Sequence, residues 1–166
     1  LFASSVYAQE PTFQAKFLGF SGIQQGQVTL NWVNGNGTDR IVLAFQGDRT
    51  NYNDWDTAGD LPTDGVLPVA NGNFAAAPIV GANARLVGDE SGVSSSVTVT
   101  GLAAGTDYSF LVLEYNTGGT PDPDYLIEGA LANPRKVTTA PLEAPTIMAF
   151  GATADDSRDF EDAFKM

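Results

Sequence analysis

The chain has 166 residues, of which 43% are hydrophobic, and it carries a net charge of −12 with no histidine and no cysteine. The apolar content is enough for a folded core, and the length favours one domain with extensions. The composition removes the usual general base near neutral pH, thiolate chemistry and disulfides. The negative charge disfavours nucleic acid and anionic membranes as partners, because it repels phosphate.

Residues 1–10 have the composition of the end of a signal peptide. Leu1 to Ala8 reads LFASSVYA, with small residues where a signal peptidase would cut. We therefore interpret residues 1–10 as a signal-peptide remnant, and the alternative is an N-terminal arm of the mature chain. The remnant predicts a secreted protein, and no other stretch approaches the length of a membrane span.

The first half of the chain alternates as β-strands do. Phe13, Ala15 and Phe17 alternate with polar neighbours and predict a strand over residues 12–20. Residues 28–33 alternate in the same way and predict a second strand with one face in the core.

The next segments combine a turn signal, an apolar run and a long polar stretch. Asn and Gly alternate over residues 34–37 and predict a β-hairpin, because both tolerate positive φ. Residues 41–45 predict a central strand. Residues 47–83 are too many for a structureless loop. We expect short strand or turn pieces near residues 65–68 and a strand over residues 84–87.

Regular strand patterns return in the second half. Residues 94–100 read SSSVTVT, residues 101–106 form a turn, residues 108–115 are the most hydrophobic strand, and residues 135–139 are the last strand. Short strands separated by turn signals predict an all-β sandwich of about seven strands.

Two of these segments resemble signatures of fibronectin type III domains. The sequence VTLNW, ending at Trp32, looks like the tryptophan-bearing second strand of that family. The sequence GLAAGTDYSF, starting at Gly101, resembles the family pattern G-L-x-P-G-T-x-Y-x-F, with Ala104 where proline is usual. The resemblance implies that Trp32 fills the core and that the hydroxyl of Tyr108 bonds back to the chain near Leu102, in a tyrosine corner.

Four further segments are similar to fibronectin-type modules in large surface proteins of Bacteroidota-type bacteria. The resemblance implies a fibronectin type III-like β-sandwich over residues 11–139 at a bacterial cell surface. It says little about function, because such modules serve as spacers, adhesive units and enzyme appendages. The four segments are NGNG, RIVLA, PTDG and LEYN, at residues 34–37, 40–44, 62–65 and 113–116.

Carboxylates gather in two predicted loops. Calcium binds several oxygen ligands from flexible acidic loops, which makes these residues calcium candidates. The simpler interpretation is hydrogen bonding of Asp side chains within polar turns, with no cofactor. The candidates are Asp54, Asp56, Asp60, Asp122 and Asp124.

An aromatic pair and one acid in an apolar strand are the remaining candidates for chemistry. Tyr52 and Trp55 would form a platform for a polysaccharide, unless Trp55 instead tucks the long loop onto the sandwich. Glu114 lies in the most apolar strand, where pairing with Arg40 or Arg135 is the ordinary explanation. No catalytic acid pair stands out, so we predict that the protein is not an enzyme.

Residues 140–166 form a C-terminal extension with two interpretations. The sequence PTIMA at residues 145–149 echoes PTFQA at residues 11–15, which indicates either the start of a second module or a segment that adds to the sheet of another copy. Phe160 and Phe164 would share one face of a short helix. The predicted assembly interface consists of Pro145, Thr146, Ile147, Met148, Ala149, Phe150, Phe160 and Phe164, together with Phe13 and Phe17.

The sequence thus predicts a non-catalytic extracellular module with a structural or adhesive role. Copies would self-associate head-to-tail into a surface filament by β-strand addition, since such contacts do not close on themselves. The alternative is a carbohydrate-binding or spacer module of a larger secreted protein.

Overall fold

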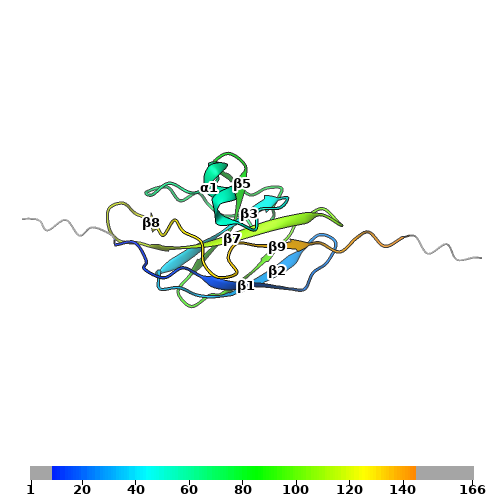
Figure 1. The fold of residues 1–166 in the computed structure, drawn as a ribbon, viewed down its shortest axis with the longest axis horizontal. Helices are drawn as coiled ribbons and strands as arrows, with labels where there is room; N and C mark the ends of the chain where they lie inside the picture. Colours follow the sequence, from blue (N-terminus) through cyan, green and yellow to red (C-terminus); the bar gives the residue numbers. More distant parts are fainter. Residues whose placement is uncertain (1–8, 145–166) are drawn as a thin grey trace, which may run out of the picture.

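The computed structural model describes residues 9–144, which form an all-β sandwich of two antiparallel sheets (Figure 1). The smaller sheet has the strand order β1-β2-β6, and the larger one has the order β4-β5-β3-β7-β8 with β9 also paired to β7. The elements are β1 (Lys16–Ser21), β2 (Val28–Val33), β3 (Asp39–Gln46), α1 (Tyr52–Thr57), β4 (Ile79–Val80), β5 (Ala84–Ser91), β6 (Ser96–Val99), β7 (Asp107–Asn116), β8 (Asp124–Tyr125) and β9 (Arg135–Thr138).

This strand order is that of a fibronectin type III sandwich. Strands β1, β2 and β6 form one layer, while β5, β3, β7 and β9 form the other, so the predicted fold class is confirmed. The short strands β4 and β8 are additions to the edges of the larger sheet. The helix in the described part of the chain is too short to cross a membrane.

The core between the sheets contains the residues that the family resemblance indicated. Trp32, Leu102 and Tyr108 are buried in one cluster with the inward residues of β2, β3 and β7. The hydroxyl of Tyr108 accepts a hydrogen bond from the backbone N–H of Ala103 at 2.9 Å, which is the expected tyrosine corner. The family resemblance therefore predicted correctly that these three residues pack in the core and that Tyr108 forms the corner.

A second core lies on the outer face of the larger sheet. Alternate residues of β7 point there, and residues 47–83 cover them, with α1 on the side of that sheet opposite β1 and β2 (Figure 1). The side chain of Trp55 is fully buried in this layer, and its Nε1–H donates to the carbonyl of Arg49 at 3.0 Å. The expectation that Trp55 tucks the long segment onto the sandwich is confirmed.

The long segment differs from its predicted secondary structure. Of the strand or turn pieces expected near residues 65–68, the structure has a turn, in which the N–H of Val66 donates to the carbonyl of Thr63 at 3.1 Å. The strand predicted over residues 84–87 continues to Ser91. Helix α1 was not expected, since its six residues have no apolar periodicity. It is stabilised by the Asn51 side chain, which accepts from the N–H of Asn53 at 3.1 Å, and by the packing of Trp55.

The first strand begins later than predicted and contains an irregularity. It starts at Lys16, and its register with β2 shifts between Lys16 and Gly19, where Phe17 has a φ of 56°. A bulge of this kind changes which face each side chain occupies. Phe17, within this irregularity, is exposed, while Ala15 just before it is buried. Phe13 lies before the strand begins and is also exposed.

The turn over residues 34–37 is not the hairpin that its sequence predicted. It carries the chain from β2 in one sheet to β3 in the other. A Cβ on Gly35 would lie 1.9 Å from the carbonyl oxygen of Phe13, and one on Gly37 would lie 2.8 Å from the carboxylate of Glu114. These glycines therefore permit a close crossing between sheets rather than a tight hairpin.

Candidate functional site

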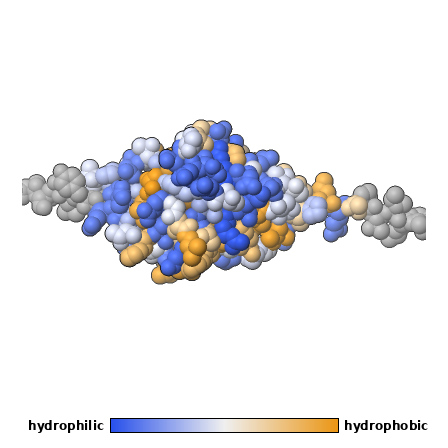
Figure 2. All heavy atoms as spheres, viewed as in Figure 1, coloured by the Kyte–Doolittle hydropathy of each residue, from blue (hydrophilic) through white to orange (hydrophobic). Residues whose placement is uncertain are grey.

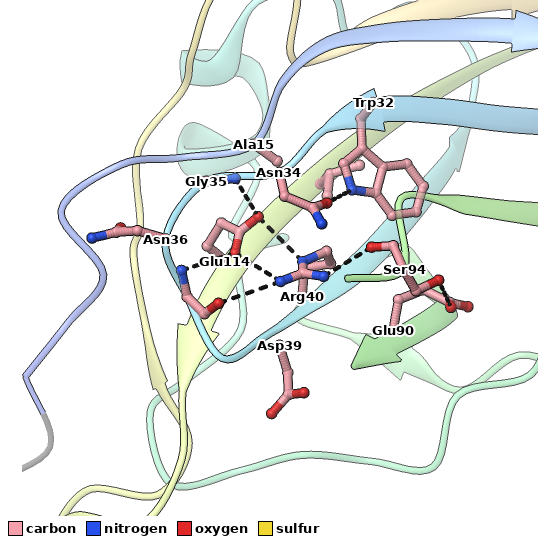
Figure 3. Close-up of polar contacts among 12 residues, drawn as sticks. Ala15, Trp32, Asn34, Gly35, Asn36, Asp39, Arg40, Glu90, Ser94 and Glu114 are labelled. Carbon is pink, nitrogen blue, oxygen red and sulfur yellow. Dashed lines mark hydrogen bonds and ion pairs between the residues drawn. The ribbon is translucent and has the colours of Figure 1, made fainter. Parts of the chain in front are cut away.

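A buried ion pair joins β3 to β7 at the crossing over residues 34–37 (Figure 3). The Nε of Arg40 lies 3.2 Å from Oε1 of Glu114, and both side chains are at most 1% exposed. The Arg40 guanidinium also donates to the carbonyls of Gly92 at 2.6 Å and Ser94 at 2.8 Å. The predicted pairing of Glu114 with Arg40 is confirmed.

The carboxylate of Glu114 has its own backbone donors. It accepts hydrogen bonds from the N–H groups of Gly35 at 2.8 Å and Gly37 at 3.1 Å. Figure 3 shows that these bonds converge on one carboxylate beside the Trp32 indole, which donates to Asn34 at 2.7 Å. Because the buried Glu114 carboxylate has two backbone donors and the Arg40 charge beside it, the network fixes the position of the crossing.

A second buried carboxylate ties the long segment to β5. Asp60 forms an ion pair with Arg49 and accepts a hydrogen bond from the N–H of Ala84 at 3.1 Å. Burial raises its pKa, but the hydrogen bonds from Arg49 and from the backbone of Asn83 and Ala84 outweigh burial and hold the pKa below its usual value. Asp60 is thus a structural anchor, and its prediction as a calcium ligand is wrong.

The other calcium candidates do not converge as a set. Asp54 and Asp56 are exposed on α1, and Asp122 is exposed and accepts a hydrogen bond from the N–H of Gly118 at 3.1 Å. Asp124 is the candidate that the fold places beside further carboxylates. Its neighbours are Glu10 and Asp64, which sequence reasoning did not connect with it.

The carboxylates of Glu10, Asp64 and Asp124 form a cluster that we call the acidic triad. Each offers an oxygen, and these oxygens lie within 4.8 Å of one another. Two hydrogen bonds hold Asp64 against the β8 region. The Asp64 carboxylate accepts from the N–H of Tyr125 at 2.9 Å, and the N–H of the next residue, Gly65, donates to the carbonyl of Pro123 at 2.8 Å. No signal in the sequence groups these acids, because they come from three distant segments.

The electrostatics of the acidic triad are unfavourable to three charges. Burial and the neighbouring Asp64 raise the pKa of Asp124 above its usual value. Burial also raises the pKa of Glu10, with contributions from Asp124, Asp64 and Glu128. A proton therefore binds Glu10 and Asp124 more readily than it binds an isolated carboxylate.

The aromatic platform predicted for sugar binding is absent from the surface that the structure describes. Trp55 is 0% exposed and packs edge-on against Phe45, with ring centroids 6.5 Å apart, so neither face can stack on a sugar. The hydroxyl of Tyr52 is buried without a hydrogen-bond partner among the described residues, and burial raises its pKa to about 12. The prediction of Tyr52 and Trp55 as a glycan contact is wrong in this structure, because the apolar face of Trp55 covers the sheet.

Part of the predicted assembly interface can be located. Phe13 and Phe17 are 68% and 50% exposed. The N–H of Phe17 donates to the carbonyl of Leu131 at 2.9 Å, and Leu131 is also exposed. Pro145, Thr146, Ile147, Met148, Ala149, Phe150, Phe160 and Phe164 lie outside the described residues, so their role stays a prediction.

Comparison with known proteins finds similarity to fibronectin type III domains of solved structure. No family model and no curated protein matches the chain. The chain is similar to the domain of human collagen XX (14% identity, TM-score 0.43, covering 82% of this chain and 100% of that one). It is also similar to the domain of human contactin 1 (13% identity, TM-score 0.46, covering 87% and 92%). A third is the domain of human fibronectin type III domain containing protein 3 (16% identity, TM-score 0.45, covering 87% and 99%). The likeness concerns the fold, whose assignment rests on the strand order and the tyrosine corner.

Proposed function

We propose that this domain is a non-catalytic structural module of an extracellular bacterial surface assembly, joined head-to-tail to other copies through its terminal segments. The observation that carries the proposal is the position of the ends. In Figure 1 the described chain begins at one end of the long axis and finishes at the other, after β9. Units with ends at opposite poles extend a linear array without turning it back on itself.

The interior supports a role as a stiff unit. The larger sheet is packed on both faces, against the smaller sheet and against residues 47–83. The loops that cross between the layers are fixed by buried hydrogen-bonded charge, as at Glu114 and Asp60. Because closely packed interiors resist deformation, the distance between the two ends of such a module changes little.

The surface offers features that strand addition requires. Among the described strands, β9 pairs with β7 alone, so its other edge presents backbone groups for a further strand. Hydrophobic side chains gather along the lower edge of the molecule in Figure 2, on the side of the smaller sheet. The exposed residues Phe17 and Leu131 are joined by a backbone hydrogen bond of 2.9 Å. An apolar segment from a neighbouring copy would find both backbone and apolar contacts at these places.

The test compares the full chain with a variant that lacks residues 145–166. This deletion keeps every strand of the described domain. We expect filaments of the full chain in electron micrographs and a larger mass by light scattering, and a monomer for the deletion variant. A synthetic peptide of residues 145–166 should bind the deletion variant, because it supplies the missing strand.

An equal mass for the two proteins would contradict assembly through the C-terminal segment. The domain would then be a spacer of a larger secreted protein, a role that also suits a module whose two ends lie at opposite poles. Failure of the peptide to bind, with filaments still lost on deletion, would show that the segment acts without pairing to the domain.

A further inference from the structure

We propose that the acidic triad of Glu10, Asp64 and Asp124 is a calcium site that ties the start of the described chain to two loops of the sandwich. The site is independent of the proposed structural role, since it rests on the geometry of these three residues. It joins the segment before β1, the loop after α1 and the start of β8.

The spacing of the three carboxylates fits one ion. Calcium binds oxygen at about 2.3–2.6 Å, so two oxygens on the same ion are at most about 5 Å apart. The oxygens of the acidic triad lie within 4.8 Å of one another, inside that limit. The three residues can therefore share a single cation with small changes of side-chain rotamer.

Asp124 provides an observation that points to a ligand independently of the spacing. It is 5% exposed, yet within residues 9–144 no N–H or hydroxyl group donates a hydrogen bond to its carboxylate. Buried carboxylates in proteins are normally hydrogen-bonded, paired or bound to metal. The other buried acids of the described chain, Asp60 and Glu114, have several partners each.

The charge around the acidic triad lacks a protein counter-ion in the described part of the chain. The ion pairs there join Arg40 to Glu114, Arg49 to Asp60, and Lys136 to two exposed acids. None reaches the triad. Carboxylates whose oxygens lie within 4.8 Å of one another repel when they are ionised. A divalent cation would remove this repulsion.

The ligand chemistry favours calcium over other divalent ions. All the donor atoms are carboxylate oxygens, which suit hard cations, and the chain contains no histidine or cysteine for zinc or copper. Calcium accepts irregular geometry and bidentate carboxylates, whereas magnesium requires a near-octahedral set and keeps its water. Three carboxylates from three segments, two of them on exposed residues, match calcium.

The experiment is calcium titration of the metal-free full chain by calorimetry, with thermal melts in calcium and in chelator. We expect one saturable site with a Kd on the order of 0.1–1 mM, the range of extracellular calcium modules, and a higher melting temperature in calcium. Magnesium at the same ionic strength should bind more weakly.

Two variants and one matched control locate the site. Asp124→Asn and Glu10→Gln should each weaken calcium binding roughly tenfold or more, because a charged ligand is lost. In chelator, Asp124→Asn should melt at a higher temperature than the parent chain, since one of three like charges is gone. Asp122→Asn makes the same change two residues away, at a carboxylate that accepts from Gly118, and should bind calcium nearly as the parent does.

Two results would overturn the proposal. One is the absence of saturable calcium binding to the parent chain. The other is unchanged affinity in both Asp124→Asn and Glu10→Gln, which would place any calcium elsewhere. Glu10 is exposed, so its substitution reports on the ligand even where the Asp124 variant folds poorly.

Discussion

At the scale of single residues, the interior of this domain depends on polar groups that meet from distant parts of the chain. Arg40 and Glu114 are separated by 74 positions and are both buried. A buried ion pair contributes little net stability over a well-packed apolar pair, but breaking it leaves a costly unpaired charge. The contribution of such a pair to the folded state is therefore tested by removing one partner and measuring the loss of unfolding free energy.

Replacing Glu114 with Gln should destabilise the domain by about 3–5 kcal/mol, because the Arg40 charge stays buried without its counter-ion. Urea denaturation of the full chain measures this loss. Asp48→Asn is the matched control, since Asp48 is exposed and its pair with Lys136 lies at the surface. A Glu114→Gln variant as stable as this control would show that the Arg40 charge finds compensation elsewhere.

Two tyrosines allow a second comparison at this scale. Tyr108→Phe removes the acceptor of the Ala103 N–H and should cost about 1–3 kcal/mol. Tyr52→Phe should be neutral or stabilising, because the Tyr52 hydroxyl is buried without a partner among the described residues. Denaturation midpoints of the two variants test the difference, and equal losses would contradict it.

At the scale of elements, residues 47–83 behave as a third layer rather than as a loop. Helix α1 and β4 are short, and neither would be stable alone. They are stabilised by covering the outward face of β3, β5 and β7. Trp55 and Asp60 are the points at which this layer is fixed to the sheet.

Trp55→Ala should cost about 3–5 kcal/mol, since it opens a cavity under the layer. Hydrogen exchange should show the loss first in α1, whose amides depend on that packing. Val69→Ala is the control, because Val69 belongs to the same segment and is 90% exposed. Fast exchange in α1 of the control as well would mean that the layer is loosely attached.

Asp60 gives the layer a pH dependence with a definite sign. Its pKa is lowered on folding, so its contribution to stability is present above the unfolded value near 3.8 and is lost as pH falls through the folded value. The stability difference between the parent chain and Asp60→Asn should therefore narrow below about pH 3.8. Acid titration of both proteins by circular dichroism measures this. An Asp54→Asn control, which changes an exposed acid of α1, separates the effect from net charge.

At the scale of the whole molecule, net charge opposes the proposed contact between copies. Each chain carries −12, so copies repel one another at long range. The proposed head-to-tail contact has to form against this repulsion. Salt reduces it, since the screening length falls from about 30 Å at 0.01 M to about 10 Å at 0.1 M.

Assembly of the full chain should therefore accelerate as sodium chloride rises from about 0.01 M to about 0.1 M in the presence of chelator. Time-resolved light scattering measures the rate. The variant without residues 145–166 is the control and should show no salt-dependent growth. A rate that falls with salt would indicate that attraction between opposite charges drives the contact.

The fibronectin-type fold could be predicted from the sequence because its determinants are local. Alternation over β2 committed one face of that strand to the core, and β7 stands out as the most hydrophobic strand. The segment around Leu102 and Tyr108 carries its own turn and hydrogen bond. Each of these features depends on residues close together in the chain. Short-range periodicity and turn chemistry are sufficient to specify them.

Only the tertiary structure decided where the long segment lies and which acids meet. The burial of Trp55, the crossing over residues 34–37 and the bulge at Phe17 arise from contacts between distant segments. Glu10, Asp64 and Asp124 converge because two loops and the segment before β1 end at the same place on the sandwich. Contacts between distant segments produce no periodic pattern in the sequence, because they depend on the path of the whole chain.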